Sequence, residues 1–348
     1  MTARVEKEIG NGVAYWLFAC ALAVFLMALI GAITRLTESG LSIARWEPVI
    51  GAVPPLSATD WQKEFDRYQE TPQYKKINKG MTMPEFKKIY FWEWIHRFWG
   101  RLIGLIYALP LLVFWLRGKI PPVAKPALLG ILVLGGLQGA MGWYMVKSGL
   151  VDMPAVSHYR LAAHLMLAFL IYACLFLMGL RFSLRPAPDA GRLSGMRGMI
   201  KGALALATLT MVWGAFVAGL DAGLLYNTFP KMDAHWFPPE MLQHKPVWRA
   251  FIEEPATVQF THRILAVLTA FKVVFIWARS RGFNGPARVN NLFTAAAVMV
   301  CLQAALGIVT LLSHVNIVPA ALHQGGALVL LTLLVWLLHE IPASAKGR

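Results

Sequence analysis

The chain has 348 residues, of which 57% are hydrophobic and 15% charged, and its formal net charge is +15. This composition excludes an ordinary soluble globular protein and indicates an integral membrane protein. The charge does not indicate nucleic-acid binding, because the basic residues are spread through short loops between apolar segments, where they set membrane topology. The three cysteines lie far apart inside apolar segments, which excludes a redox pair or a thiolate cluster.

Eight segments are apolar enough to cross a bilayer, which needs about 20 residues of helix. They are 13–34, 90–116, 126–146, 159–180, 200–220, 257–278, 291–312 and 319–339. Loops rich in Lys and Arg alternate with loops that have few of them, so the positive-inside rule predicts that both termini are cytoplasmic. The long segments 35–88 and 221–256 are then external.

The first long external loop is predicted to contain helices of its own. Thr59-Asp-Trp-Gln62 and Thr82-Met-Pro-Glu85 have the spacing of capping boxes, which mark helix starts. Trp61, Phe65 and Tyr68 then fall on one stripe. The pattern predicts a short amphipathic helix, which lies either on the outer membrane surface or with an ordinary packing face against the protein.

The two halves of the chain are similar, which indicates an internal duplication. The matching parts are Gly31–Leu41 with Gly214–Leu224, Leu137–Gly142 with Leu302–Gly307, His96-Arg97 with His262-Arg263, and His164 with His323. Each half then has four spans in the same orientation. We therefore expect an all-α membrane protein built as two pseudo-symmetric four-helix bundles in a parallel repeat, residues 1–190 and 191–348.

Four histidines lie about one to two turns inside the external ends of spans two, four, six and eight: His96, His164, His262 and His323. A single histidine in an apolar helix is usually a core residue, but four at matching depth, in duplicated pairs, favour a binding site. Two imidazoles on facing helices suit haem, whereas zinc would need additional cysteine or carboxylate ligands. Since all four lie toward one membrane face, two haems would sit side by side there, which disfavours an electron conduit across the membrane.

Charged side chains accompany these histidines. Arg97 and Arg263 either pair with haem propionates or reach toward the membrane interface. Glu93 precedes His96 by three residues and shares its helix face, and the second half has Gln259 instead. Burial beside a haem would suit Glu93 to hold or relay a proton. The alternative is an ion pair with Arg97 that makes the helix end tolerable in lipid.

With these residues in view, the chain resembles the haem A synthase family over essentially its whole length. The matching stretches are Arg35–Ser42, Trp46–Pro48, Gly51, Pro54-Pro55, Glu93–Arg97, Gly100-Arg101, Leu137–Gly142, His164, Asn227–Met232, Thr261–Arg263 and Leu322–Gln324. One branch of the family has a cysteine pair in the first external loop. This chain has no cysteine there, so it is similar to the cysteine-free branch found in proteobacteria and mitochondria.

The resemblance implies oxidation of the C8 methyl group of haem O to a formyl group through successive hydroxylations, which gives haem A for cytochrome oxidase. It also implies a bacterial inner-membrane location with the haem sites toward the periplasm, a resident haem b in the second half and a haem O substrate in the first. Together with the reasoning above, this assigns Glu93 as catalytic residue, His96, His164 and Arg97 to the substrate haem, and His262, His323 and Arg263 to haem b.

The alternative functions are a dihaem b-type electron-transfer protein and a haem transporter without redox chemistry. The expected partners are haem O and membrane lipid, with a haem O synthase, cytochrome oxidase assembly factors and further copies of this chain as candidates. No nucleic acid is expected.

Overall fold

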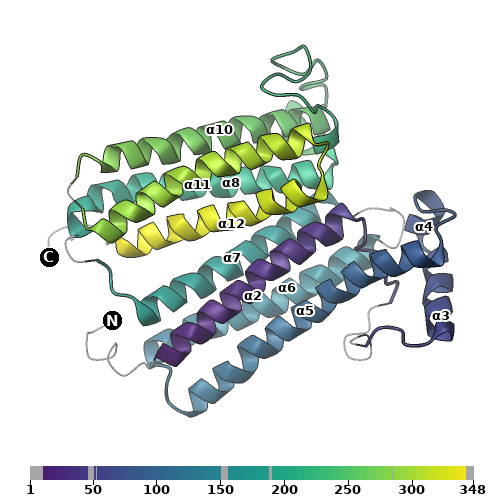
Figure 1. The fold of residues 1–348 in the computed structure, drawn as a ribbon, viewed down its shortest axis with the longest axis horizontal. Helices are drawn as coiled ribbons and strands as arrows, with labels where there is room; N and C mark the ends of the chain where they lie inside the picture. The colour runs from purple at the N-terminus through teal and green to yellow at the C-terminus, as the bar shows by residue number, and fades with distance from the viewer. Residues whose placement is uncertain are drawn as a thin grey trace.

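The computed structural model describes residues 11–45, 51, 53–149, 156–187, 190–283 and 285–341. Within these residues the protein is helical, and eight helices are long and apolar enough to cross a membrane (Figure 1). They are α2 (Asn11–Leu36), α5 (Met83–Leu116), α6 (Lys125–Gly149), α7 (His158–Ser183), α8 (Arg197–Gly219), α10 (Pro255–Ser280), α11 (Ala287–Leu312) and α12 (Ile317–Glu340). The expected all-α fold with eight candidate spans is confirmed. The predicted motif Trp46–Pro48 lies outside the described residues.

Seven of the eight expected spans agree with the structure to within four residues at each end. The exception is α5, which begins at Met83 and not at residue 90. The backbone N–H of Thr82 donates to the Glu85 side chain at 2.8 Å, as the predicted capping box requires. A search for apolar length missed the first two turns because Glu85, Lys87 and Lys88 interrupt their apolar residues.

The shorter helices connect these spans. They are α3 (Ala58–Gln69), α4 (Pro72–Lys76) and α9 (Val247–Glu253), with the 3-10 turns η2 (Pro122–Ala124), η3 (Ala190–Met196) and η4 (Ala222–Leu224). In Figure 1, α3, α4 and the segment between α8 and α10 lie at the right-hand end of the molecule, where α2 ends and α5, α7, α10 and α12 begin. All four predicted ligand histidines are in the half of their helix nearer this end.

The α3 helix is a packing element of the protein. Its Phe65 and Tyr68 are buried against Phe86 of α5, so the second of the two readings of this amphipathic helix is the one observed. The helix is also capped differently from the prediction. Ser57, and not Thr59, is the N-cap, and its hydroxyl accepts a backbone N–H at 3.1 Å.

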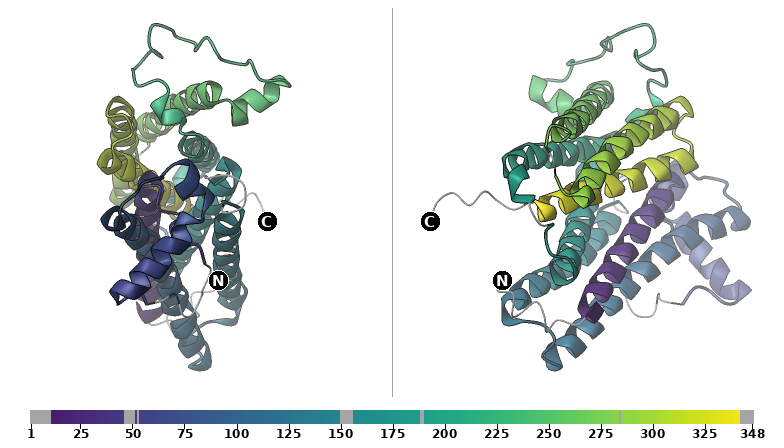
Figure 2. Two further views of the ribbon diagram at one scale, coloured as in Figure 1. Left: turned by 90° about the vertical axis from the view of Figure 1, so that its right-hand side faces the viewer. Right: turned by 60° about the vertical axis from the view of Figure 1, so that its left-hand side comes forward.

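The spans pack mainly within each half of the chain, as two groups of helices, and α12 also contacts helices of the first half. In the first half α2 packs against α5 and α7, and α6 packs against α7. In the second half α8 packs against α10 and α12, and α11 packs against α10 and α12. The groups meet where α12 lies beside α2 and α7, and where α7 lies beside α8 (Figures 1 and 2). This arrangement brings α12, which carries His323, next to a helix of the first half.

Candidate functional site

Each of the four predicted ligand histidines lies against a glycine of a neighbouring helix. A Cβ added at these glycines would lie 2.9–3.5 Å from the nearest imidazole atom. The pairs are His96 with Gly31 of α2, His164 with Gly142 of α6, His262 with Gly214 of α8, and His323 with Gly307 of α11. A larger residue would displace the imidazole at three of these positions, where the distance is 3.2 Å or less. The glycines belong to the segments that match between the halves.

The two histidines of each half come from different helices. His96 on α5 and His164 on α7 are close enough to interact electrostatically, as are His262 on α10 and His323 on α12. All four side chains are half-buried. The pairing that the sequence predicts within each half is therefore the pairing that the structure brings together.

The depth of the histidines differs from the expectation in one case. His164, His262 and His323 lie six or seven residues after the start of their helices, about two turns. His96 lies more than three turns after Met83, because α5 extends further outward than the sequence predicts.

Hydrogen bonds from neighbouring residues hold the ring of His262 and the backbone at His164 and His323. The Nδ1 atom of His262 lies 3.1 Å from the carbonyl oxygen of Thr210, so an N–H at Nδ1 donates to it and leaves Nε2 available as a ligand. A glutamine serves the other histidine of each half. The Nε2 of Gln303 donates to the His323 carbonyl at 2.8 Å, and that of Gln138 donates to the His164 carbonyl at 3.1 Å. Sequence reasoning did not single out these glutamines, although both stand in a repeated Leu-Gln motif.

The Glu93 carboxylate is buried and fully engaged. Its Oε1 accepts from the guanidinium of Arg97 at 2.5 Å, and the exposed fractions of the two side chains are 2% and 9%. Its Oε2 accepts from the hydroxyl of Ser42 and from the backbone N–H of Ile43, both at 2.7 Å. Glu93 thus ties the segment that follows α2 to α5. In the second half the amide of Gln259 donates to the carbonyl of Tyr226 at 3.0 Å and ties the segment that follows α8 to α10.

The two arginines next to histidines bind backbone carbonyls. Arg97 donates to Ile43 and Arg45 at 3.0 and 2.8 Å. Arg263 donates to Tyr226 and Thr228, both at 2.9 Å. Each guanidinium therefore fixes the segment that follows α2 or α8 against the histidine-bearing helix. Their predicted pairing with haem propionates remains a prediction.

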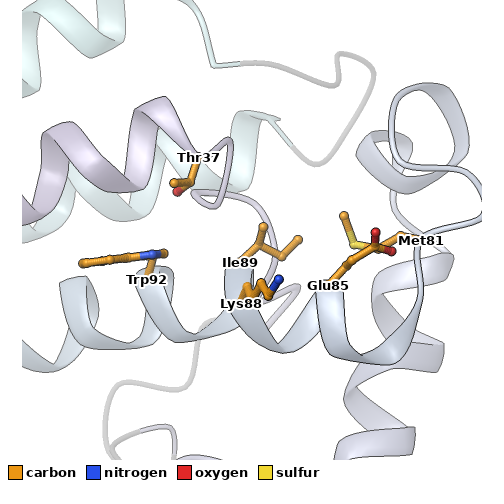
Figure 3. Close-up of a pocket in the computed structure, with 6 residues that line it drawn as sticks. All are labelled: Thr37, Met81, Glu85, Lys88, Ile89 and Trp92. Atoms are coloured by element: carbon orange, nitrogen blue, oxygen red, sulfur yellow. The ribbon is translucent and has the colours of Figure 1, made fainter. Parts of the chain in front are cut away.

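An open pocket of about 400 Å³ lies between the end of α2 and the outer turns of α5 (Figure 3). Its lining residues are Thr37, Met81, Glu85, Lys88, Ile89 and Trp92. None of the four histidines lines it.

Among the described residues, no group of three or more His, Cys, Asp or Glu side chains comes together as a metal site. The donor sets that the structure does assemble near the histidines are pairs of imidazoles. Two imidazoles match the two axial positions of a haem iron, whose remaining ligands are supplied by the macrocycle.

Comparison with known proteins shows the family to which this chain belongs. A family model described as cytochrome oxidase assembly protein matches residues 14–335. The Heme A synthase of Rhodospirillum centenum is 52% identical, over 97% of this chain and 90% of the relative. Those of Nitrosospira multiformis and Paramagnetospirillum magneticum are 48% and 45% identical, over 97% of this chain and 94% and 96% of the relatives. The chain belongs to the COX15-CtaA family of cytochrome oxidase assembly proteins.

Proposed function

We propose that this protein is a haem A synthase, which oxidises the C8 methyl group of haem O to a formyl group and so supplies haem A to cytochrome oxidase. The observation that carries the proposal is the pair of imidazoles that each half assembles from two helices, in a chain whose relatives bear that name. The two halves, residues 1–190 and 191–348, are on this proposal repeats with different tasks.

The second half suits a resident haem b. His262 and His323 would supply the axial imidazoles, and the hydrogen bond from His262 to Thr210 orients Nε2 for this purpose. Gly214 and Gly307 leave the imidazoles room beside the neighbouring helices. When bound, haem iron supplies the electron-transfer and oxygen chemistry that amino-acid side chains lack.

The first half suits the substrate haem O, held near His96 and His164. It has the same pairs of histidine and glycine as the second half, and it adds one carboxylate. Gln259 performs the same anchoring task without a charge, so anchoring alone does not require a carboxylate at Glu93. We assign to Glu93 the acceptance or relay of protons while the methyl group is oxidised.

The alternation of basic and non-basic loops supports a proposed orientation with both termini in the cytoplasm and the histidine pairs toward the periplasm of a bacterial inner membrane. Reporter fusions after Lys119 and after Gln243 test this orientation. The first reporter should be cytoplasmic and the second periplasmic, and the reverse result would overturn the placement of both sites.

Extraction of the haems from the purified protein, and from membranes that contain it together with haem O, tests the function. A haem A synthase yields haem A and retains haem b. A dihaem electron-transfer protein retains haem b and makes no haem A, and a haem transporter without redox chemistry holds haem loosely and also makes none. The cysteine-free first loop implies that haem A formation persists when thiols are blocked with an alkylating reagent.

A further inference from the structure

Helix α12, which carries His323, is held to the first half by Gln324, the residue that follows His323. The side-chain amide of Gln324 on α12 donates from Nε2 to the carbonyl of Ala28 on α2 at 2.6 Å, across 296 residues of sequence. A Cβ at Gly325 would lie 3.0 Å from the side chain of Leu29. The glycine thus allows the close approach of the two helices, and Gln324 fixes their register.

This hydrogen bond connects one histidine pair with the other. Ala28 lies about one turn before Gly31 on α2, and Gly31 is the glycine against which His96 packs. On the opposite side, Gln303 of α11 donates to the carbonyl of His323. A series of direct contacts therefore runs from α11 through His323 and Gln324 to α2, and from there to His96.

The contact between α7 and α8, which corresponds in the repeat to that between α12 and α2, has an apolar residue at the position of Gln324. Because His164 matches His323 in the repeat, Leu165 of α7 takes the place of Gln324. Leu165 packs against an apolar cluster of Ala162 on α7 with Ala215 and Phe216 on α8. An apolar residue is thus sufficient to join α7 to α8. Burying an amide in an apolar helix–helix contact costs free energy unless the amide is hydrogen-bonded. The presence of Gln324 in the contact between α12 and α2, and of an apolar residue in the contact between α7 and α8, therefore needs a separate reason.

We infer that Gln324 is a positioning residue, which sets the orientation of His323 relative to the histidines of the first half. The inference rests on the proposed function in that the two pairs hold a resident and a substrate haem, whose relative placement governs the reaction. A displacement of about 1 Å at a reacting centre costs on the order of a hundredfold in rate.

The experiment compares Gln324→Met, which keeps length and removes the donor, with Thr332→Val as the matched control. Thr332 also lies on α12 and bonds across to the first half, through the Tyr172 hydroxyl at 2.6 Å, but it is nine residues from His323. Three quantities are measured for each variant: haem b content, the electron paramagnetic resonance spectrum of the resident low-spin haem, and kcat and KM for haem O.

Gln324→Met should keep haem b and KM, change the g-values that report the orientation of the axial imidazoles, and lower kcat by about tenfold or more. Thr332→Val should change none of these. An unchanged spectrum and kcat in Gln324→Met overturns the inference, as does equal loss in both variants. If Gln324→Met does not fold, Gln324→Asn, whose amide falls one methylene short, is judged by the same criteria. If the wild-type protein converts no haem O, the proposed function fails, while the spectral comparison still decides the role of Gln324.

Discussion

Arg97 and Arg263 make the same pair of hydrogen bonds at corresponding places in the two halves. Counted from the matched glycines Gly40 and Gly223, Ile43 corresponds to Tyr226 and Arg45 to Thr228. Arg97 donates to the carbonyls of Ile43 and Arg45, and Arg263 donates to the carbonyls of Tyr226 and Thr228. The difference is that Arg97 also forms a buried ion pair with Glu93.

This difference predicts that replacing each arginine with glutamine lowers the stability of the protein by unequal amounts. Arg97→Gln leaves the Glu93 carboxylate buried without its counter-ion, which should cost about 3–5 kcal/mol. Arg263→Gln removes hydrogen bonds to carbonyls and should cost about 1–3 kcal/mol. Thermal unfolding of the two variants in the same detergent shows which of them is destabilised more. The double variant Glu93→Gln/Arg97→Gln should recover part of the loss, and a larger destabilisation by Arg263→Gln would contradict this account.

Glu93→Gln separates a chemical role from an anchoring role. If Glu93 handles protons, the variant should keep its fold and its haem b, while haem A formation falls by roughly a hundredfold, the scale for a positioned acid or base. If Glu93 only anchors the segment after α2, the protein yield should fall instead. Glu85→Gln, on the outer turns of the same helix, is the control and should leave haem A formation unchanged. Haem A formation at the normal rate in Glu93→Gln would remove the catalytic assignment.

A methyl group at Gly307 should disturb the resident haem. The added Cβ would lie 2.9 Å from Cε1 of His323, so the imidazole must move and the low-spin b-type absorption should decrease. Gly139→Ala is the control, because a Cβ there meets no described atom within 4 Å. That variant should keep its haem and gain about 0.5–1 kcal/mol of helix stability. Equal haem content in both variants would show that the glycine is not needed for histidine placement.

The ligand assignment of the second half is tested by His262→Ala and His323→Ala. Each should lose the low-spin b-type spectrum, because one axial imidazole is missing. His244→Ala should keep it, since His244 lies in the loop before α9 with its Nε2 3.1 Å from the carboxylate of Glu253. The assignment is wrong if both ligand variants retain a full complement of six-coordinate low-spin haem.

The segment after α8 that Arg263 binds contains a tyrosine whose titration can be measured. Burial, together with a hydrogen bond from its hydroxyl to Glu240 and the charge of that carboxylate, raises the pKa of Tyr226 to about 12. The hydroxyl therefore stays protonated well above neutral pH. Glu240→Gln removes the negative charge, so the pKa of Tyr226 should fall toward its ordinary value of about 10. Tyrosinate absorbance of the variant against the wild type measures the change, and identical titration curves would show that the pair does not form.

Apolar length and an internal repeat in the chain predict the helical fold and four candidate ligand histidines. Apolar length located seven of the eight spans closely, because a membrane span is a local property of about 20 residues. The repeat predicted that His96 belongs with His164 and His262 with His323, and the structure places them so. The capping box at Thr82 predicts a helix start, but the charged residues Glu85, Lys87 and Lys88 separate it from the continuous apolar segment of α5.

The contacts that hold those residues in place could not be predicted from the chain alone. The glycine opposite each imidazole, the carbonyls that Arg97 and Arg263 bind, and the anchoring of Ile43 by Glu93 all join residues distant in sequence. The bond from Gln324 to Ala28 is the extreme case, because it links the last helix to the first. Periodicity and spacing describe which residues share a face of one helix. They do not describe which helix that face meets, and that contact places the side chains of the site.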